Sequence, residues 1–208
     1  MQPGTYPVRF SVDYPARPLD RVSTLFRIFT VIPIAIVLSA VSGSATAQTG
    51  NTSFRVAGAG GILFLAPLLM IVFRQKYPRW WFDWNLELQR FSNRVIAYLA
   101  LMDDHYPATD DQQSVHLDYD YPNVPRDLNR WLPLVKWLLA IPHYVVLFFL
   151  DIAAVAVVVA AWFAILVTGR YPRSLFDFVE AVLAWNNRVL GYAFTLVTDE
   201  YPPFRFTA

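Results

Sequence analysis

Residues 75–98 read QKYPRWWFDWNLELQRFSNRVIAY, and residues 169–192 read GRYPRSLFDFVEAVLAWNNRVLGY. Both stretches contain Tyr-Pro-Arg, then Phe-Asp, then Asn-Arg-Val at the same spacing. A match of this length inside a chain of 208 residues indicates that one structural unit occurs twice.

The similarity continues on both sides of these stretches. The alignment places Arg27 opposite Lys136 and Asn93 opposite Asn187. The further aligned segments are VRFSVDYP (8–15) with VHLDYDYP (115–122), LFRIFTVIP (25–33) with LVKWLLAIP (134–142), and DDHYP (103–107) with TDEYP (198–202). A period of about 100 residues is typical of a duplicated domain rather than of a solenoid.

We therefore expect two repeats, residues 1–107 and 108–208. Each is expected to contain a short strand, two apolar helices, an amphipathic helix and a Tyr-Pro exit. The segments VRFSVDY and VHLDYDY alternate well enough between apolar and polar residues to predict short strands. A two-fold axis between the repeats would pair these strands antiparallel, beneath the membrane.

The composition indicates a protein that faces lipid. Apolar residues make up 56% of the chain and charged residues 16%, against roughly 25% charged in soluble domains. The net charge of +1 gives no sign of nucleic-acid binding or of a solvating acidic tail. The absence of cysteine excludes disulfides and thiolate metal sites.

Four apolar segments approach the ~20 residues with which a helix crosses ~30 Å of hydrocarbon. These segments are residues 28–45, 56–73, 132–150 and 152–167. They predict an all-α membrane protein with four transmembrane helices in two hairpins. The first hairpin is expected to turn in the polar stretch 42–53 and the second at Asp151, because one helix over 132–167 would be ~54 Å long, far beyond the bilayer core.

Two other interpretations of the apolar segments are weaker. Buried helices of a soluble core would need other surface to cover them, and the chain offers little. Residues 28–41, followed by Ala45 and Ala47, resemble the core and cleavage site of a signal peptide. Asp13 and Asp20 in a long preceding region argue against cleavage.

Charge predicts the orientation. Of 17 Lys and Arg residues, 16 lie outside the two hairpin loops or at helix ends facing the same side, and only Arg55 lies in a loop. The positive-inside rule then places both termini in the cytoplasm of a multi-pass protein. Because each half crosses an even number of times, the repeats would be parallel, related by an axis along the membrane normal.

Residues 79–102 and 173–197 are predicted as amphipathic helices at the membrane interface. Their apolar stripes consist of Trp84, Leu88, Phe91, Val95 and Tyr98 in the first, and Phe178, Val182, Trp185, Val189 and Tyr192 in the second. Such a stripe suits either the headgroup region or packing onto the protein's own bundle. Asp83 and Arg94 are three turns apart and must find separate partners, as must Asp177 and Arg188.

The candidate contact residues lie on these two helices. An anionic-lipid or partner site would comprise Arg79, Arg90, Arg94, Arg173, Arg188, Trp84 and Trp185. The alternative is that the arginines fasten the helices to the bundle. Asp151 and His143 are left open, since Asp151 suits either a proton pathway or a hairpin tip in water.

Catalytic motifs are absent. The chain has no Gly-rich phosphate loop, no HExxH and no GxSxG, so we expect no enzyme, no cofactor and no metal site.

The second half resembles a known family. The stretches RWLPLVKWLLAIPHYVVLFFL, GRYPRSLFDFVEAVLAWNNRV and TDEYPPF are similar to a bacterial membrane family called domain of unknown function 4389. The first half looks like a diverged copy, with WWFDW, SNRV and DDHYP at the corresponding places. The resemblance implies a bacterial plasma membrane location and carries no activity or site residue.

These observations favour a non-enzymatic accessory or assembly subunit of a larger bacterial membrane complex. The expected partners are the lipid bilayer, anionic lipid headgroups and other membrane proteins, but not nucleic acid. The alternatives are a small transporter or channel built from the two halves, and a lipid-binding, membrane-shaping protein.

Overall fold

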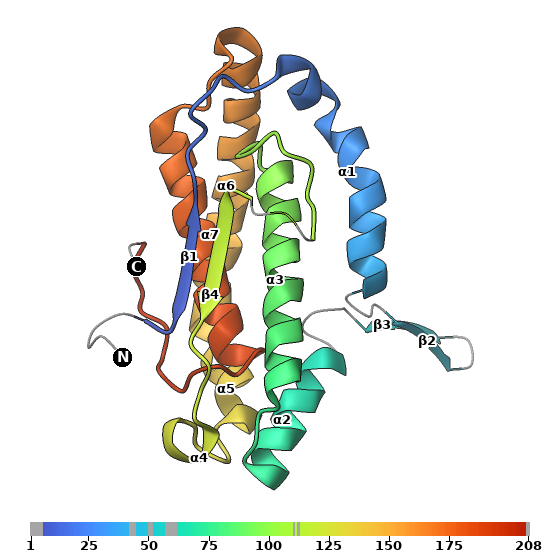
Figure 1. Cartoon of the computed structure of the whole chain (residues 1–208), viewed down its shortest axis with the longest axis vertical. Helices are drawn as coiled ribbons and strands as arrows, with labels where there is room; N and C mark the ends of the chain where they lie inside the picture. The colour runs from blue at the N-terminus through green and yellow to red at the C-terminus, as the bar shows by residue number, and fades with distance from the viewer. Residues whose placement is uncertain are drawn as a thin grey trace.

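The computed structural model describes residues 6–41, 45–49, 52–56, 62–109, 111 and 113–206. It is mostly helical, with a small two-stranded ribbon along one side (Figure 1). In chain order the elements are β1 (Val8–Val12), α1 (Arg21–Val41), β2 (Ala45–Thr49), β3 (Thr52–Val56), α2 (Ile62–Arg74), α3 (Arg79–Leu99), β4 (Val115–Tyr119), α4 (Val124–Asp127), α5 (Pro133–Leu139), α6 (Ile141–Thr168) and α7 (Arg173–Ala193).

Strands β1 and β4 form the ribbon. They pair antiparallel, as expected for two strands related by a two-fold axis. Phe10 lies opposite Leu117 at the centre of the register, and these two residues also hold the same position in the alignment of the halves. The local two-fold axis of the ribbon therefore exchanges aligned residues of the first and second halves.

Each ribbon strand packs on a helix from the opposite half. The backbone N–H of Val12 in β1 donates a hydrogen bond to the Glu180 carboxylate on α7, at 2.9 Å. Arg90 Nε on α3 donates to the carbonyl oxygen of Leu117 in β4, at 2.8 Å. Each half therefore supplies one strand of the ribbon and the helix that supports the other half's strand, so neither half forms the ribbon and its supporting helices alone.

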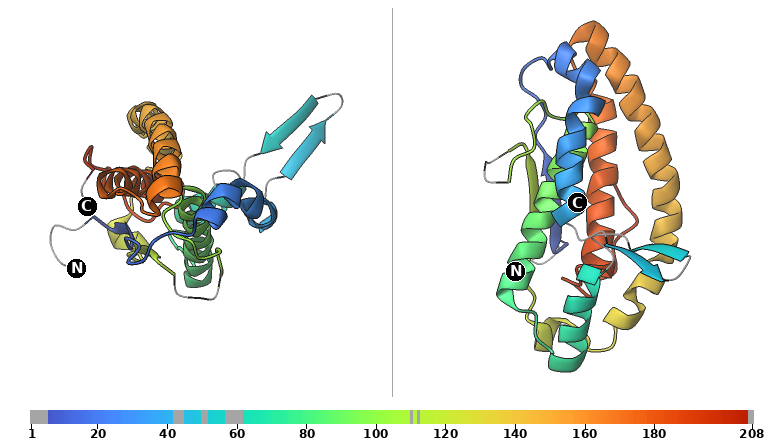
Figure 2. Two further views of the ribbon diagram at one scale, coloured as in Figure 1. Left: turned by 90° about the horizontal axis from the view of Figure 1, so that it is seen from above. Right: turned by 90° about the vertical axis from the view of Figure 1, so that its right-hand side faces the viewer.

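Helices α3 and α7 lie between the ribbon and the outer helices α1 and α6 (Figure 2). Gly191 permits the close approach of α7 to β1, since a Cβ there would lie 2.6 Å from Val8 Cγ2. Most of the predicted apolar stripe residues turn into the protein: Leu88, Phe91, Val95, Tyr98, Val182, Trp185, Val189 and Tyr192 are buried, whereas Phe178 is half-buried and Trp84 is exposed. Phe91, Val95 and Tyr98 of α3 pack with Val31 of α1, and Trp185, Val189 and Tyr192 of α7 pack with Leu147 of α6.

The predicted hairpin at Asp151 is wrong. Helix α6 runs without a break through Asp151, and the chain instead breaks at Ala140, between α5 and α6. Pro142 stands in the first turn of α6, where its missing N–H leaves no hydrogen bond unmade. Helix α6 ends at Gly169, whose φ of 73° suits a left-handed cap. A single polar residue such as Asp151 did not stop the helix.

Two helices, α1 and α6, are long and apolar enough to cross a membrane. Only 17% of each apolar window is buried, unlike the core helix of a soluble protein. The expectation of four transmembrane helices is not met in the described residues. Helix α2 has 13 residues, too few for a span, and the expected span over 56–73 also includes residues 57–61, which lie outside the described part.

The polar stretch 42–53 also differs from a simple loop. Its described residues belong to strands β2 and β3, which pair antiparallel with Ala45 opposite Val56. Residues 42–44, 50 and 51 lie outside the described part of the chain. This hairpin projects from the body where α1 ends (Figure 2).

Candidate functional site

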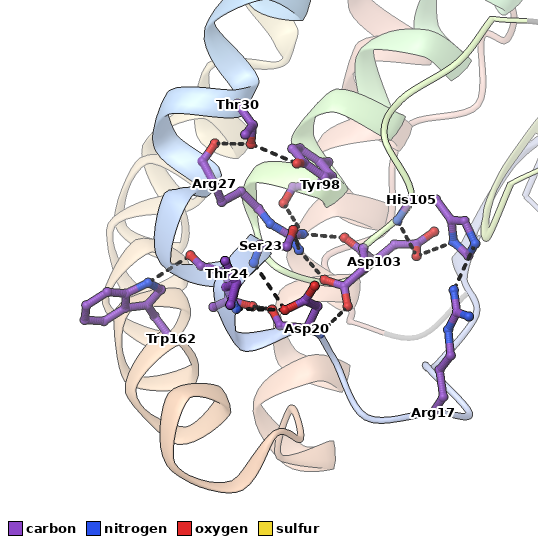
Figure 3. Close-up of polar contacts among 12 residues, drawn as sticks. Arg17, Asp20, Ser23, Thr24, Arg27, Thr30, Tyr98, Asp103, His105 and Trp162 are labelled. Atoms are coloured by element: carbon purple, nitrogen blue, oxygen red, sulfur yellow. Dashed lines mark hydrogen bonds and ion pairs between the residues drawn. The ribbon is translucent and has the colours of Figure 1, made fainter.

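A buried arginine joins α1 to the segment after α3. The Arg27 guanidinium donates hydrogen bonds to the carbonyl oxygens of Tyr98 and Asp103 and to Ser23 Oγ, and it forms an ion pair with Asp104 (Figure 3). It also lies over the Tyr98 ring, 4.3 Å from the centroid. A buried charge needs such partners, because desolvation would otherwise make it costly.

A buried lysine makes the corresponding contacts in the second half. Lys136 Nζ on α5 donates to the carbonyl oxygen of Thr198 at 2.7 Å and pairs with the Asp199 carboxylate at 2.7 Å. It lies over the Tyr192 ring, 5.2 Å from the centroid. Burial lowers the pKa of Lys136, while the hydrogen bond and charge of Asp199 act in the opposite direction.

The two buried cations hold aligned positions, and so do their partners. Tyr98 aligns with Tyr192, and Asp104 aligns with Asp199. In the first half the cation ties α1 to the segment that follows α3, and in the second half it ties α5 to the segment that follows α7. Both cations are engaged by their own chain, so these clusters position helices rather than bind a substrate. The alignment of Arg27 with Lys136 was the sequence signal for them.

A pair of asparagines joins α3 to α7. Asn93 Nδ2 donates to Asn187 Oδ1 at 2.8 Å, and Asn187 Nδ2 donates to Asn93 Oδ1 at 2.7 Å. Both side chains are buried, and each also donates to a carbonyl oxygen one turn earlier in its own helix. The bonds are reciprocal, as expected of aligned residues that face each other across a two-fold axis.

Two of the predicted contact arginines contact the strand ends from exposed positions. Arg79 pairs with Asp83 and lies over the Tyr121 ring, 4.8 Å from the centroid. Arg173 pairs with Asp177 and lies over the Tyr14 ring, 4.7 Å from the centroid. In both cases the tyrosine comes from the opposite half of the chain.

The other predicted arginines bind backbone carbonyls. Arg94 Nη1 donates to the carbonyl oxygen of Ala108 at 2.6 Å, and Arg188 Nη2 donates to that of Arg205 at 2.5 Å. Arg90 holds β4 through the carbonyl oxygen of Leu117, as described above. Burial lowers the pKa of Arg188, and the nearby Arg205 lowers it further. These contacts match the alternative in which the arginines fasten the helices.

The two predicted tryptophans differ. Trp84 is 37% exposed and lies beside Trp81, with ring centroids 5.3 Å apart. Trp185 is buried, and its Nε1 donates to Nδ1 of the buried His143 at 3.1 Å. The Phe204 ring stacks on His143 with centroids 3.9 Å apart, so this histidine belongs to an aromatic cluster.

An apolar groove lies between α1 and α6. Its volume is about 540 Å³, and α3 and α7 form its floor. Trp162 Nε1 donates to the carbonyl oxygen of Thr24 at 3.2 Å, which joins the two outer helices (Figure 3). The polar side chains in the lining are Thr24, Arg27 and Asp151, and the remainder are apolar. Sequence reasoning did not find this groove, because its walls come from four separate helices.

Asp151 lies on α6 at this groove, not at a hairpin tip. Asn186 Nδ2 on α7 donates to Asp151 Oδ1 at 2.8 Å. Within the described part of the chain, no group of three or more His, Asp or Glu residues could hold a metal ion. The groove is therefore lined mainly by apolar side chains, with one exposed carboxylate.

A family model described as "Domain of unknown function (DUF4389)" matches residues 131–205, which supports the resemblance of the second half. The match includes α5, α6, α7 and the segment with Asp199. No curated protein and no solved structure matches the chain.

Proposed function

We propose that this protein is a non-enzymatic accessory subunit of a larger complex in the bacterial plasma membrane. The observation that carries the proposal is the separation of the surface into an apolar face and a charged face. Helices α1, α2, α5 and α6 form the apolar face, and the β1–β4 ribbon with the adjoining sides of α3 and α7 forms the charged face.

The apolar face is large and nearly free of charge. Within residues 22–41, 64–73 and 131–168, whose side chains the structure describes, Asp151 is the one exposed charged side chain, since Arg27, Lys136 and His143 are buried. Large side chains along it are exposed, including Ile28, Phe149 and Val167. Soluble monomers rarely expose a continuous apolar surface of this extent, so lipid is the medium that suits it.

The charged face carries ion pairs open to solvent. Arg9 pairs with Asp120 at 2.8 Å across the ribbon, and Arg90 pairs with Asp118 at 2.6 Å. Exposed ion pairs contribute about 0–1 kcal/mol to stability, so they are not needed for the fold. Fixed charges of both signs on a rigid ribbon suit recognition of a polar protein surface.

We also propose that the chain contains an internal duplication. Its support is that aligned residues make equivalent contacts: the Arg27 and Lys136 clusters, the Asn93–Asn187 pair and the Phe10–Leu117 register. The repeats are related by the ribbon's two-fold axis.

Affinity purification from mild-detergent extracts of the native membrane tests the function. We expect a partner protein at fixed stoichiometry on native gels and in mass spectra. The double variant Arg9→Glu with His116→Glu adds negative charge to the ribbon and should lower the amount of bound partner at least tenfold. Arg126→Glu is the control, because this side chain is 84% exposed on α4, away from the ribbon. A protein that runs alone, or equal retention by both variants, contradicts the proposal.

A second candidate is lipid binding, and the groove favours it. A volume of about 540 Å³ lies within the roughly 300–1,000 Å³ usual for small-molecule sites. Native mass spectrometry of the purified protein should then detect a bound lipid. The variant Val158→Trp places a larger side chain in the groove. It should remove the bound lipid while the partner protein stays bound.

A further inference from the structure

The apolar face is longer than a membrane is thick. Helices α5 and α6 have 7 and 28 residues and follow one another along the long axis (Figure 1). At 1.5 Å per residue they extend about 50 Å, against ~30 Å of hydrocarbon in a bilayer. Exposed apolar side chains occur from Trp131, before α5, to Val167, at the end of α6. If α5 and α6 crossed the bilayer, part of this apolar face would lie in water.

The charged ribbon lies beside the middle of α6 rather than beyond its ends. Val12 in the ribbon contacts Glu180, and Asn186 contacts Asp151 in α6. Glu180 and Asn186 are six residues apart on α7, about 9 Å along the helix. If α6 crossed the bilayer, the exposed ion pairs of the ribbon would therefore lie at hydrocarbon depth, where charged side chains are costly.

We propose that the protein lies flat in one leaflet, with its long axis parallel to the membrane plane. Helices α1, α2, α5 and α6 then form a layer among the acyl chains, α3 and α7 lie at headgroup level, and the ribbon faces water. One layer of helices is about 10–12 Å thick, which fits the ~15 Å of hydrocarbon in a single leaflet. This inference rests on the membrane location in the proposed function.

The groove identifies the occupant of the apolar face as lipid chains. Its α6 wall extends from Asp151 to Trp162, about 16 Å along the helix. Its lining is apolar apart from Thr24, Arg27 and Asp151, which suits hydrocarbon. An acyl chain is thin enough to enter, and its flexibility lets it follow the uneven walls.

The flat orientation also places two polar features. Asp151 would lie deep in the bilayer if α6 crossed it, whereas in the flat orientation its contact with Asn186 keeps it next to the headgroup-level helix α7. The β2–β3 hairpin projects beyond α1 (Figure 2). Its open strand edges cannot stay unpaired in hydrocarbon, so in the membrane this hairpin must fold back toward the headgroups.

Cysteine labelling distinguishes the orientations, and the natural chain has no cysteine. Ala16→Cys and Arg126→Cys place one thiol in an exposed segment at each end of the long axis (Figure 1). Sealed membrane vesicles of each orientation are treated with a membrane-impermeant maleimide. We expect both positions to react from the same side, at least tenfold faster than from the other. Reaction from opposite sides would overturn the flat orientation and leave the membrane location intact.

A matched pair tests the face itself. His116 on the ribbon and Val155 on α6 are both more than half exposed in the protein alone. In membranes His116→Cys should react readily, while Val155→Cys should react at least tenfold more slowly until the protein is denatured. If both react equally, lipid does not cover α6, and the proposed function fails together with this inference. If both are protected, the ribbon also lies in lipid and the protein crosses the bilayer.

Discussion

The two halves of the chain build the same long outer helix in different ways. In the first half, α1 and α2 have 21 and 13 residues and are separated by the β2–β3 hairpin. In the second half, α5 and α6 have 7 and 28 residues and are separated at Ala140. The summed helix lengths are nearly equal, but the interruption falls at a different place. The aligned contacts are nevertheless kept, which shows that they do not depend on where the outer helix is broken.

The buried cations show a second difference between the halves. Arg27 engages four groups, namely two carbonyl oxygens, the Ser23 hydroxyl and the Asp104 carboxylate. Lys136 engages the Thr198 carbonyl oxygen and the Asp199 carboxylate. The planar guanidinium has five N–H donors, whereas the ammonium has three. The first half therefore gathers more acceptors around its cation.

The largest expected effect comes from removing each cation in turn. Arg27→Met and Lys136→Met each leave a partly buried carboxylate and carbonyl oxygens without their donor. We expect each to lower the free energy of unfolding by about 3–5 kcal/mol, with Arg27→Met the larger because more acceptors are orphaned. Unfolding by guanidinium chloride in detergent micelles measures the free energy of unfolding of each variant. Arg126→Met should change the free energy by less than about 0.5 kcal/mol, since its side chain is exposed. Losses equal to that control would show that the clusters do not hold the helices.

The asparagine pair should show a smaller effect that is shared by the halves. Asn93→Leu leaves the buried Asn187 amide without its partner, and Asn187→Leu does the converse. We expect each to cost about 1–3 kcal/mol, and the double variant to cost less than the sum, because it leaves no orphaned amide. A double-mutant cycle in the same unfolding assay gives the coupling. Simple additivity would mean that the reciprocal hydrogen bonds contribute nothing to the contact between α3 and α7.

The smallest expected effect is a difference in stability between variants of two aligned tyrosines, Tyr77 and Tyr171. Tyr77 Oη donates to the carbonyl oxygen of Thr195 at 2.9 Å, whereas the buried hydroxyl of Tyr171 has no hydrogen-bond partner among the residues that the structure describes. We expect Tyr77→Phe to cost about 1 kcal/mol, and Tyr171→Phe to be neutral or slightly stabilising, because it removes an unsatisfied polar group. Thermal unfolding in micelles resolves this difference. Equal losses in the two variants would contradict it.

Part of this architecture could be predicted from sequence. Alternation in VRFSVDY and VHLDYDY predicted the strands, and the symmetry argument predicted their antiparallel pairing. Asp83 and Asp177 were expected to find partners other than Arg94 and Arg188, and they pair with Arg79 and Arg173. These features depend on local spacing, or on a symmetry that the alignment itself displays.

The prediction of a hairpin at Asp151 was wrong for a physical reason. A helix over residues 132–167 is too long only if it crosses the bilayer along the membrane normal. Hydropathy reports how apolar a helix is, but not its direction relative to the membrane. The apolar groove was also missed, since its walls join residues from α1, α3, α6 and α7 that no sequence window contains.

The sequence by itself determined the strands and the apolar character of the outer helices, because each depends on residue type at short spacing. Tertiary structure alone decided where those helices break. The aligned segments LFRIFTVIP and LVKWLLAIP both end in Ile-Pro, yet α1 continues through Pro33 while the chain breaks just before Pro142. A proline weakens a helix at its own position, but the packing around it decides whether the helix bends, continues or ends.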